Sequence, residues 1–278
     1  MSAGTAPAVA ERAPAALAAR ALSALVMAPL ALAAILAGSP WFALMIALGC
    51  GVLAWEWASL CGRGRFGGSG WTLLASVLAA LAAAAAGAPR LALLIAVLGT
   101  AAVLASAWPA GRARALWHAS GALYLAVPSI AMIWLRGTAG ASAVLWLFLV
   151  VWVTDIAAFA AGRLIGGPKL APRISPKKTW AGLAGGLAAA AAAGALLAGP
   201  LGLSSRATLI GLSALLSIVA QGGDLAESAI KRHYKVKDMS GLIPGHGGLF
   251  DRVDGLLAAA PAAAMIELLG GNGVLAWR

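Results

Sequence analysis

The sequence predicts an all-α, polytopic integral membrane protein, a bundle of about nine transmembrane helices with a cytoplasmic N-terminus. Of the 278 residues, 62% are hydrophobic and only 10% are charged, whereas about a quarter of an average soluble domain is charged. Apolar runs recur along the whole chain, each close to the ~20 residues that cross a bilayer. The breaks between these runs are alternately rich and poor in Lys and Arg. These features exclude a disordered chain and a soluble domain of ordinary composition.

Short breaks that contain Arg, Lys, Gly or Pro separate the nine apolar runs. We expect each run to be a helix, because lipid leaves the backbone polar groups of a segment to be satisfied within that segment. Strands of a β-barrel would be shorter and would alternate in polarity, which the alanine-rich stretch 187–197 does not do. The runs are 21–38, 41–61, 71–88, 91–108, 115–135, 141–162, 179–198, 207–230 and 253–270.

The first run follows Arg12 and Arg20, as the apolar core of a signal peptide would. The run is longer than such a core and further spans follow it, so we expect an uncleaved membrane anchor. The two cysteines, Cys50 and Cys61, lie in or at the end of the second run. They indicate neither a disulfide framework nor a zinc site, and we expect both to be small buried side chains.

The basic residues predict the orientation of the bundle, because cytoplasmic loops carry an excess of Lys and Arg. With the N-terminus inside, the inner segments hold sixteen of the twenty basic residues and the outer segments hold four. The outer four are Arg90, Arg136, Arg206 and Arg278. The inner sixteen are Arg12, Arg20, Arg63, Arg65, Arg112, Arg114, Arg163, Lys169, Arg173, Lys177, Lys178, Lys231, Arg232, Lys235, Lys237 and Arg252. This split explains the net charge of +11 without a nucleic acid partner.

Two inner segments, 163–178 and 231–252, hold ten of these sixteen charges. Five carboxylates also lie within 31 positions of one another; they are Asp224, Glu227, Asp238, Asp251 and Asp254. The positive-inside rule does not explain this crowding, since it is indifferent to which inner loop holds the charge. We therefore expect scaffold helices in 1–140 and a catalytic region in 141–278, joined as one continuous membrane domain.

The first candidate group lies in the eighth run, where Asp224, Glu227, Ser228 and Lys231 are spaced i, i+3, i+4 and i+7. On a helix this spacing puts the four side chains on one face. A carboxylate within a membrane segment is costly, and it therefore indicates a functional site. The alternative is a purely structural ion pair between Asp224 and Lys231.

The second candidate group is the glycine-rich segment before the ninth run, where His246 precedes Gly247 and Gly248. Glycines permit tight turns and close approach of the backbone to a ligand. Asp251 and Asp254 follow one helical turn apart, and a cap of the ninth helix is the competing role for them. For His246 three roles stay open: a general base, a phosphate donor or a packed turn residue.

Asp224 and Asp251 are the predicted metal ligands, because they come from separate helices on the same side of the membrane. Mg²⁺ in proteins takes one or two carboxylates and fills its octahedron with waters and substrate phosphates. We expect these two carboxylates to bind it together.

A third candidate group, Ser175 to Thr179, precedes the seventh run. Ser175 at an N-cap and Pro176 at the first helical position predict that a helix starts here. The exposed amides of that helix, with Lys177 and Lys178, would form a phosphate site. The alternative is a basic anchor at the membrane surface.

Two acidic residues and a set of glycines complete the candidates. Asp155 is expected about 10 Å from the inner end of the sixth run, facing the same cavity. Glu56 is expected to be an interface residue whose carboxylate reaches water, and it is not assigned to the site. Gly182, Gly185 and Gly186 are expected to serve close helix packing.

The stretch 228–254 resembles the signature of the phosphatidate cytidylyltransferases, or CDP-diacylglycerol synthases, without a departure across its 27 residues. The residues that carry the resemblance are Ser228, Ile230, Lys231, Arg232, Lys237, Asp238, Ser240, Ile243, Pro244, His246, Gly247, Gly248, Leu249, Asp251, Arg252, Val253 and Asp254. Ser175 to Thr179 and Asp155 also resemble the family's pattern, so the resemblance covers roughly 150–256. The N-terminal half matches only in being hydrophobic.

The resemblance implies a nucleotidyltransferase that transfers CMP from CTP to phosphatidate, giving CDP-diacylglycerol and diphosphate for phospholipid synthesis. It implies Mg²⁺ held by Asp224 and Asp251, a K⁺ ion beside it, and Lys231 and His246 as further catalytic residues. The implied location is the inner membrane of a bacterium, with the active site on the cytoplasmic side. The implied substrate-binding residues are Ser175, Lys177, Lys178, Thr179, Ser228, Arg232, Lys237, Asp238, Gly247, Gly248, Arg252 and Asp155.

Two other classes of function share part of this pattern. A CTP-dependent lipid kinase or another lipid cytidylyltransferase would share the nucleotide site but not the acceptor. A transporter fits less well, because transporters place polar groups near the midplane between structural repeats. In the predicted topology eight of the nine acidic residues fall on the inner side, with Glu267 as the exception. Membrane lipids are expected partners, and the bundle is compatible with a homodimer.

Overall fold

The computed structural model describes residues 28–199, 205–242 and 247–270. Over these residues the chain is an all-α bundle with one small sheet, which confirms the predicted fold class. A short helix, Ala28–Ala37, forms the described part of the first predicted run. The long helices are α2 (Trp41–Cys61), α3 (Gly68–Ala85), α4 (Pro89–Ala107), α5 (Arg112–Thr138), α6 (Gly140–Leu164), α7 (Trp180–Leu197), α8 (Arg206–His233) and α9 (Phe250–Leu269).

Seven of the described helices, α2 to α8, are long and apolar enough to cross a membrane. The last helix, α9, is 20 residues long but carries Asp251, Arg252, Asp254 and Glu267. It therefore has the length of a span, while its charged first turn is suited to the edge of the membrane. The protein is an integral membrane protein with several spans.

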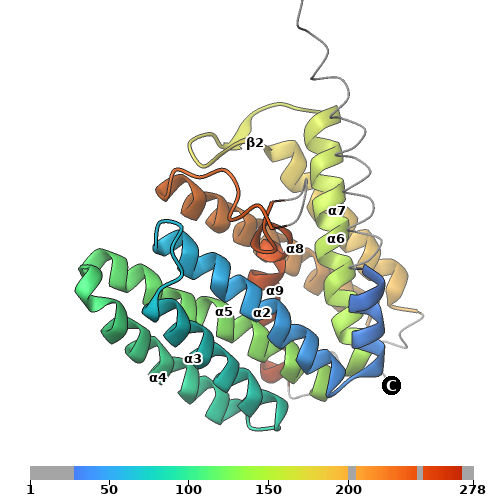
Figure 1. Cartoon of the computed structure of the whole chain (residues 1–278). Coiled ribbons are helices and arrows are strands. Elements are labelled where there is room, and N and C mark those ends of the chain that lie inside the picture. Colours follow the sequence, from blue (N-terminus) through green and yellow to red (C-terminus); the bar gives the residue numbers. More distant parts are fainter. Residues whose placement is uncertain (1–27, 200–204, 243–246, 271–278) are drawn as a thin grey trace, which may run out of the picture.

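The helices form two groups that meet at α5, α8 and α9 (Figure 1). On one side, α2, α3 and α4 pack with α5 around a buried core that contains Trp57 and Leu125. On the other side, α6 and α7 pack with α8 around a core that contains Trp146 and Leu147. Helix α9 contacts α5, α6 and α8, so its first turn lies between the two groups.

Glycines of α7 allow this helix to approach α6 closely, as the sequence predicted. A Cβ on Gly182 would lie 2.8 Å from the carbonyl oxygen of Ala158, and a Cβ on Gly186 would lie 3.1 Å from that of Thr154. The cysteine prediction is also confirmed, because Cys50 and Cys61 are both buried free thiols. These small side chains serve packing.

The predicted helix start at Ser175 is wrong. Ser175 lies instead in a two-stranded antiparallel sheet, which pairs β1 (Lys169–Ala171) with β2 (Ser175–Thr179). The other short element is a 3-10 helix, Trp108–Ala110, before α5. Helix α7 begins after β2, where the Thr179 hydroxyl accepts a hydrogen bond of 3.0 Å from the Gly182 amide. Pro176 is tolerated because a two-stranded sheet has only edge strands, where one missing N–H costs little. The lysines next to it therefore project from a hairpin.

Three connections meet at one end of the bundle. The Tyr234 hydroxyl donates to Cys61 Sγ at 3.3 Å, which joins the ends of α8 and α2. The rings of Trp117 and His233 stack with centroids 4.8 Å apart, which joins the start of α5 to the end of α8. Arg232 Nε donates to the Ile174 carbonyl at 3.2 Å and attaches the hairpin at the same end. The loops next to these helix ends, and the hairpin, are segments that the positive-inside count places on the inner side of the membrane.

Candidate active site

The crossing of α8 and α9 brings the carboxylates of the two helices together. At the crossing, a Cβ on Gly223 would lie 2.7 Å from both the Asp254 carbonyl oxygen and Ala258 Cβ. A larger residue there would push the helices apart, so this glycine sets the distance between α8 and α9. Asp224, the next residue of α8, is held close to Asp254 as a result.

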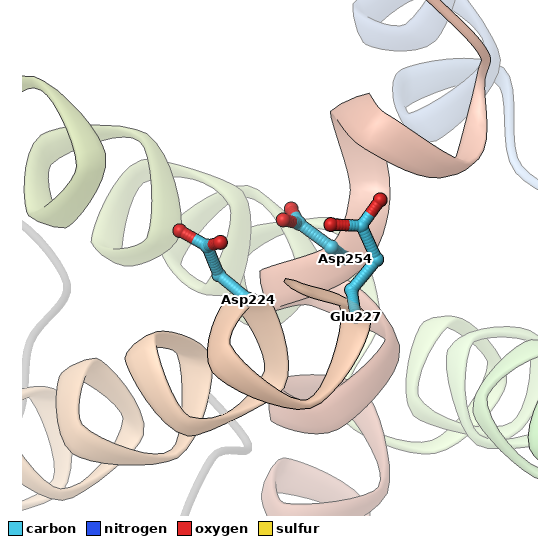
Figure 2. A group of neighbouring side chains, drawn as sticks. All are labelled: Asp224, Glu227 and Asp254. Carbon is cyan, nitrogen blue, oxygen red and sulfur yellow. The ribbon is translucent and has the colours of Figure 1, made fainter. Parts of the chain in front are cut away.

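Asp224, Glu227 and Asp254 form the acidic cluster, in which one oxygen from each carboxylate lies within 4.8 Å of the others. Figure 2 shows that Asp224 and Glu227 come from consecutive turns of α8, and Asp254 from the neighbouring turn of α9. The Glu227 side chain is only 1% exposed. Like charges this close repel each other strongly away from water, so nearby cations or a retained proton must stabilise the cluster.

Two lysines supply positive charge to the acidic cluster. Lys178 of β2 lies 2.6 Å from Asp224 Oδ2. Lys231 of α8 lies 2.6 Å from Glu227 Oε2 and 2.8 Å from Asp251 Oδ1, bridging α8 and α9. The structural alternative, a pair between Asp224 and Lys231, is not the arrangement seen, because each residue has another partner.

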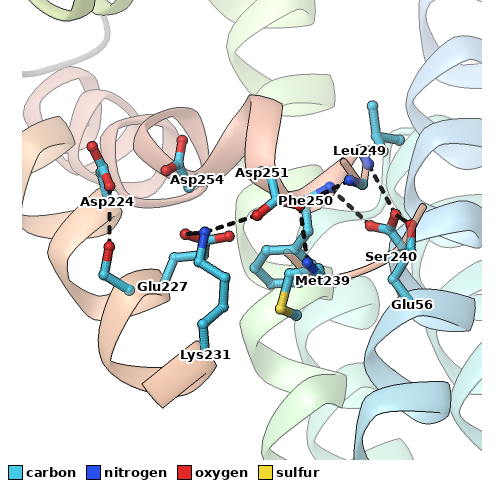
Figure 3. A network of polar contacts seen from close by, with 12 residues as sticks. Glu56, Asp224, Glu227, Lys231, Met239, Ser240, Leu249, Phe250, Asp251 and Asp254 are labelled. Carbon is cyan, nitrogen blue, oxygen red and sulfur yellow. Dashed lines mark hydrogen bonds and ion pairs between the residues drawn. The ribbon is translucent and has the colours of Figure 1, made fainter. Parts of the chain in front are cut away.

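Asp251 organises the turn before α9 and lies outside the acidic cluster. One of its oxygens pairs with Lys231, and the other accepts from the amides of Gly248 at 2.8 Å and Met239 at 3.0 Å (Figure 3). The capping role considered for Asp251 thus describes its contacts well. The residue that lies beside Asp224 is Asp254, one helical turn later.

Glu56 of α2 is a functional candidate that the sequence reasoning missed. Its side chain is fully buried, so the expected position at the water interface is wrong. It accepts hydrogen bonds from the Ser240 hydroxyl at 2.5 Å, the Leu249 amide at 2.9 Å and the Phe250 amide at 2.8 Å (Figure 3). It therefore satisfies amides at the start of α9 that have no partner within the helix. The sequence did contain a signal for Glu56, because a carboxylate within an apolar span indicates a functional site. The same reasoning selected Asp224.

Packing around Glu56 fixes the start of α9 in place. The Phe250 ring stacks on Trp57 and on Tyr124, with centroids 5.8 and 5.7 Å apart. A Cβ on Gly248 would collide with Glu56 Oε1. The turn therefore needs a glycine at this position because a carboxylate from α2 fills the space.

The other predicted site residues lie at the same end of the bundle. Asp155 of α6 is within electrostatic range of Asp224, Lys178 and Arg252, and the Ser228 hydroxyl donates to Asp224 Oδ1 at 3.5 Å. The predicted residues whose side chains are exposed are Lys177, Arg232, Lys237, Asp238 and Arg252. Gly247 adopts a φ of 80°, Ser175 is half-buried in β2, and Thr179 is buried at the start of α7. His246 lies outside the described residues, so none of its three candidate roles is tested.

The fold and the site define a polytopic membrane protein with lysines and a carboxylate cluster gathered at one end of the bundle, an arrangement suited to phosphorylated substrates. The chain belongs to the cytidylyltransferase family, whose sequence profile matches residues 18–269.

Relatives of this chain carry the name phosphatidate cytidylyltransferase. One from Pseudomonas aeruginosa is 37% identical over 268 residues, which cover 91% of this chain and 98% of that protein. One from Brucella suis biovar 1 is 48% identical over 176 residues, which cover 63% of each chain. One from Haemophilus influenzae is 44% identical over 126 residues, or 42% of each chain. The aligned region thus spans less than two thirds of the Brucella protein.

Proposed function

We propose that this protein transfers CMP from CTP to phosphatidate, giving CDP-diacylglycerol and diphosphate. The family membership and the names of the relatives supply the reaction. The structural observation that supports it is the acidic cluster paired with Lys178 and Lys231. We place the enzyme in the inner membrane of a bacterium with this site on the cytoplasmic side, because the positive-inside count puts the hairpin and the α8–α9 connection there.

The donor set of the acidic cluster fits Mg²⁺. Its three oxygens are hard ligands on two helices, close enough together to share one ion. We propose that Asp224 and Asp254 hold the ion, with Glu227 beside them, and that Asp251 positions the turn. A bound Mg²⁺ would neutralise phosphate charge and stabilise the leaving diphosphate. The K⁺ ion stays a prediction of the family resemblance.

In this proposal the residues of the chain position the two substrates and stabilise the charge of their phosphates. In the proposed reaction an oxygen of the phosphatidate phosphate attacks the α-phosphorus of CTP, and the bond to diphosphate breaks. Such a transfer needs little covalent chemistry from the protein and much charge stabilisation. Lys178 belongs to a strand of the hairpin and has a long side chain. Its ammonium group, which pairs with Asp224 in the structure, would pair with a substrate phosphate instead when substrate binds. Lys231 holds Glu227 and Asp251 in place and presents its charge to the same site.

The test is an assay of the purified protein with labelled CTP, phosphatidate and Mg²⁺. Formation of CDP-diacylglycerol and diphosphate in equal amounts is the expected result. A phosphorylated lipid with CDP would instead indicate a CTP-dependent lipid kinase, and transfer to another lipid would indicate a different cytidylyltransferase. The homodimer stays a prediction, which the mass of the purified protein in detergent would test.

A further inference from the structure

The hairpin of β1 and β2 holds more positive charge than the acidic cluster pairs with. Lys178 is the hairpin lysine that contacts Asp224. The sequence has no acidic residue between Asp155 and Asp224, so the charge of this segment has one sign. Four other basic residues in or next to the hairpin have exposed side chains, and we call them the hairpin cations: Arg163, Lys169, Arg173 and Lys177.

The two faces of β2 separate Lys178 from its neighbour Lys177. Successive side chains of a strand point to opposite faces. The Lys178 side chain is half-buried and lies 2.6 Å from Asp224 Oδ2, whereas Lys177 is exposed. Next to the turn of the hairpin, the carbonyl of Ile174 accepts a hydrogen bond of 3.2 Å from Arg232 Nε. The hairpin is therefore attached to α8 on the side of Lys178, and Lys177 points away from the acidic cluster.

Large apolar side chains at both bases of the hairpin place it at the membrane surface. Figure 1 shows the hairpin at the ends of α6 and α7. Leu164 is 84% exposed and Ile165 is 73% exposed at the end of α6, and Trp180 is 55% exposed at the start of α7. Such side chains at the end of a span contact lipid, and Trp favours the level of the headgroups. The four residue steps from Ile165 to Lys169 span at most about 14 Å, so the first hairpin lysine stays close to that level.

We propose that the hairpin cations bind the headgroups of anionic phospholipids that are not substrates, such as phosphatidylglycerol, in the leaflet next to the candidate active site. A cluster of four or more Lys and Arg directly beside a span attracts an anionic lipid surface. The attraction is electrostatic and is therefore screened by salt. The inference goes beyond the transfer of CMP, because it concerns a face of the hairpin that the proposed reaction leaves unused.

The exposure of the hairpin cations favours a lipid surface over a single bound nucleotide. Exposed cations act mainly through their summed field, which a surface with many negative charges complements. Sites for small molecules are instead concave, with a few polar groups directed at one point. Lys178, which does point at the acidic cluster, belongs to the same strand as Lys177. Lipid bound on the exposed face would thus hold the strand that presents Lys178 to Asp224.

A fluorophore at the turn of the hairpin reports which lipids lie next to it. Pro172 is exposed, and Pro172→Cys provides the site for a thiol-reactive fluorophore, because Cys50 and Cys61 are buried. The full-length labelled protein is reconstituted into phosphatidylcholine vesicles that contain no phosphatidate. Each sample receives the same small amount of spin-labelled phosphatidylglycerol or spin-labelled phosphatidylcholine, with the nitroxide near the top of the acyl chain. The ratio of quenching by the first lipid to quenching by the second measures the local enrichment of anionic lipid.

With Pro172→Cys alone, the quenching ratio should be about threefold or more at low salt, and it should fall close to one at about 1 M salt, where the Debye length is about 3 Å. Adding Lys169→Gln and Arg173→Gln should lower the low-salt ratio by about half or more. The matched control adds Arg63→Gln and Arg65→Gln instead. These two exposed residues of the connection between α2 and α3 carry the same charge and are also expected on the inner side, so the ratio at the hairpin should not change.

A low-salt ratio near one would overturn the inference, and so would equal ratios for the two double variants. The salt series needs no substitution of a basic residue, so it tests the inference even if the variant with Lys169→Gln and Arg173→Gln does not fold. The proposed function is tested separately. A protein with the expected ratios that forms no CDP-lipid from CTP and phosphatidate would support this inference and refute the proposed function.

Discussion

The amide of Phe250, at the first position of α9, donates a hydrogen bond of 2.8 Å to the carboxylate of Glu56 on α2, across 194 positions of sequence. This contact links the scaffold half of the chain to the helix that carries Asp251 and Asp254. The N-terminal half therefore does more than support the bundle, because it sets the position of the first turn of α9.

Glu56→Gln should lower turnover and the unfolding temperature together. The glutamine keeps one acceptor oxygen but loses the charge, and a hydrogen bond to a charged group contributes about 1.5–3 kcal/mol. Ser240→Ala removes only one of the three partners of Glu56 and should have a smaller effect on both quantities. Turnover and thermal unfolding in detergent are the measurements. Wild-type values for Glu56→Gln would contradict this role.

Gly248→Ala should inactivate the protein by displacing the Glu56 carboxylate. An added methyl group in a filled site costs about 1–3 kcal/mol, and here the displaced group holds the start of α9. Gly241→Ala, in the same connection but with open space around the added Cβ, is the control. Adding Glu56→Asp to Gly248→Ala should restore part of the activity, because the shorter side chain gives room. Equal activities of the two alanine variants would count against the contact.

Lys231→Met should destabilise the protein by about 3 kcal/mol, because it leaves Glu227 and Asp251 without their shared cation. The loss should be visible as a lower unfolding temperature. Adding Glu227→Gln removes one of the two unpaired charges and should recover part of it. A double variant that is no more stable than Lys231→Met would show that the charge of Glu227 is not what Lys231 compensates.

Lys178→Ala should raise the KM for CTP or phosphatidate about tenfold, since a charge-assisted hydrogen bond to phosphate would be lost. Lys177, its neighbour in β2, is exposed, and the lysines that pair with the acidic cluster are Lys178 and Lys231. Lys177→Ala should therefore change either KM by less than about threefold. Steady-state kinetics of the two variants make a matched comparison. The opposite order of effects would return the substrate contact to Lys177.

Much of the fold and part of the site follow from sequence. Long apolar runs predict the spans because lipid permits little else, and the i, i+3, i+7 spacing places Asp224, Glu227 and Lys231 on one face of α8. The hairpin was missed because Ser175 and Pro176 are also good helix-start residues. Its antiparallel pairing depends on contacts that local sequence does not encode.

The roles of the two aspartates of α9 could not be separated from spacing alone. Asp251 and Asp254 are one turn apart, and which of them faces α8 depends on how the helices cross at Gly223. Glu56 is a similar case, because its partners lie in a loop more than 180 positions away. Long-range packing decides both, and local patterns do not report it.

The most direct test of the central claim, that Asp224 and Asp254 hold a divalent ion, is Mn²⁺ binding to the purified protein, followed by electron paramagnetic resonance. Mn²⁺ is a spectroscopic substitute for Mg²⁺ at oxygen ligands. Asp224→Asn and Asp254→Asn should each weaken Mn²⁺ binding at least tenfold and abolish turnover, while Asp251→Asn should lower turnover through the turn and bind Mn²⁺ nearly as the wild type does. Wild-type Mn²⁺ affinity in Asp254→Asn, with the loss in Asp251→Asn instead, would contradict the account.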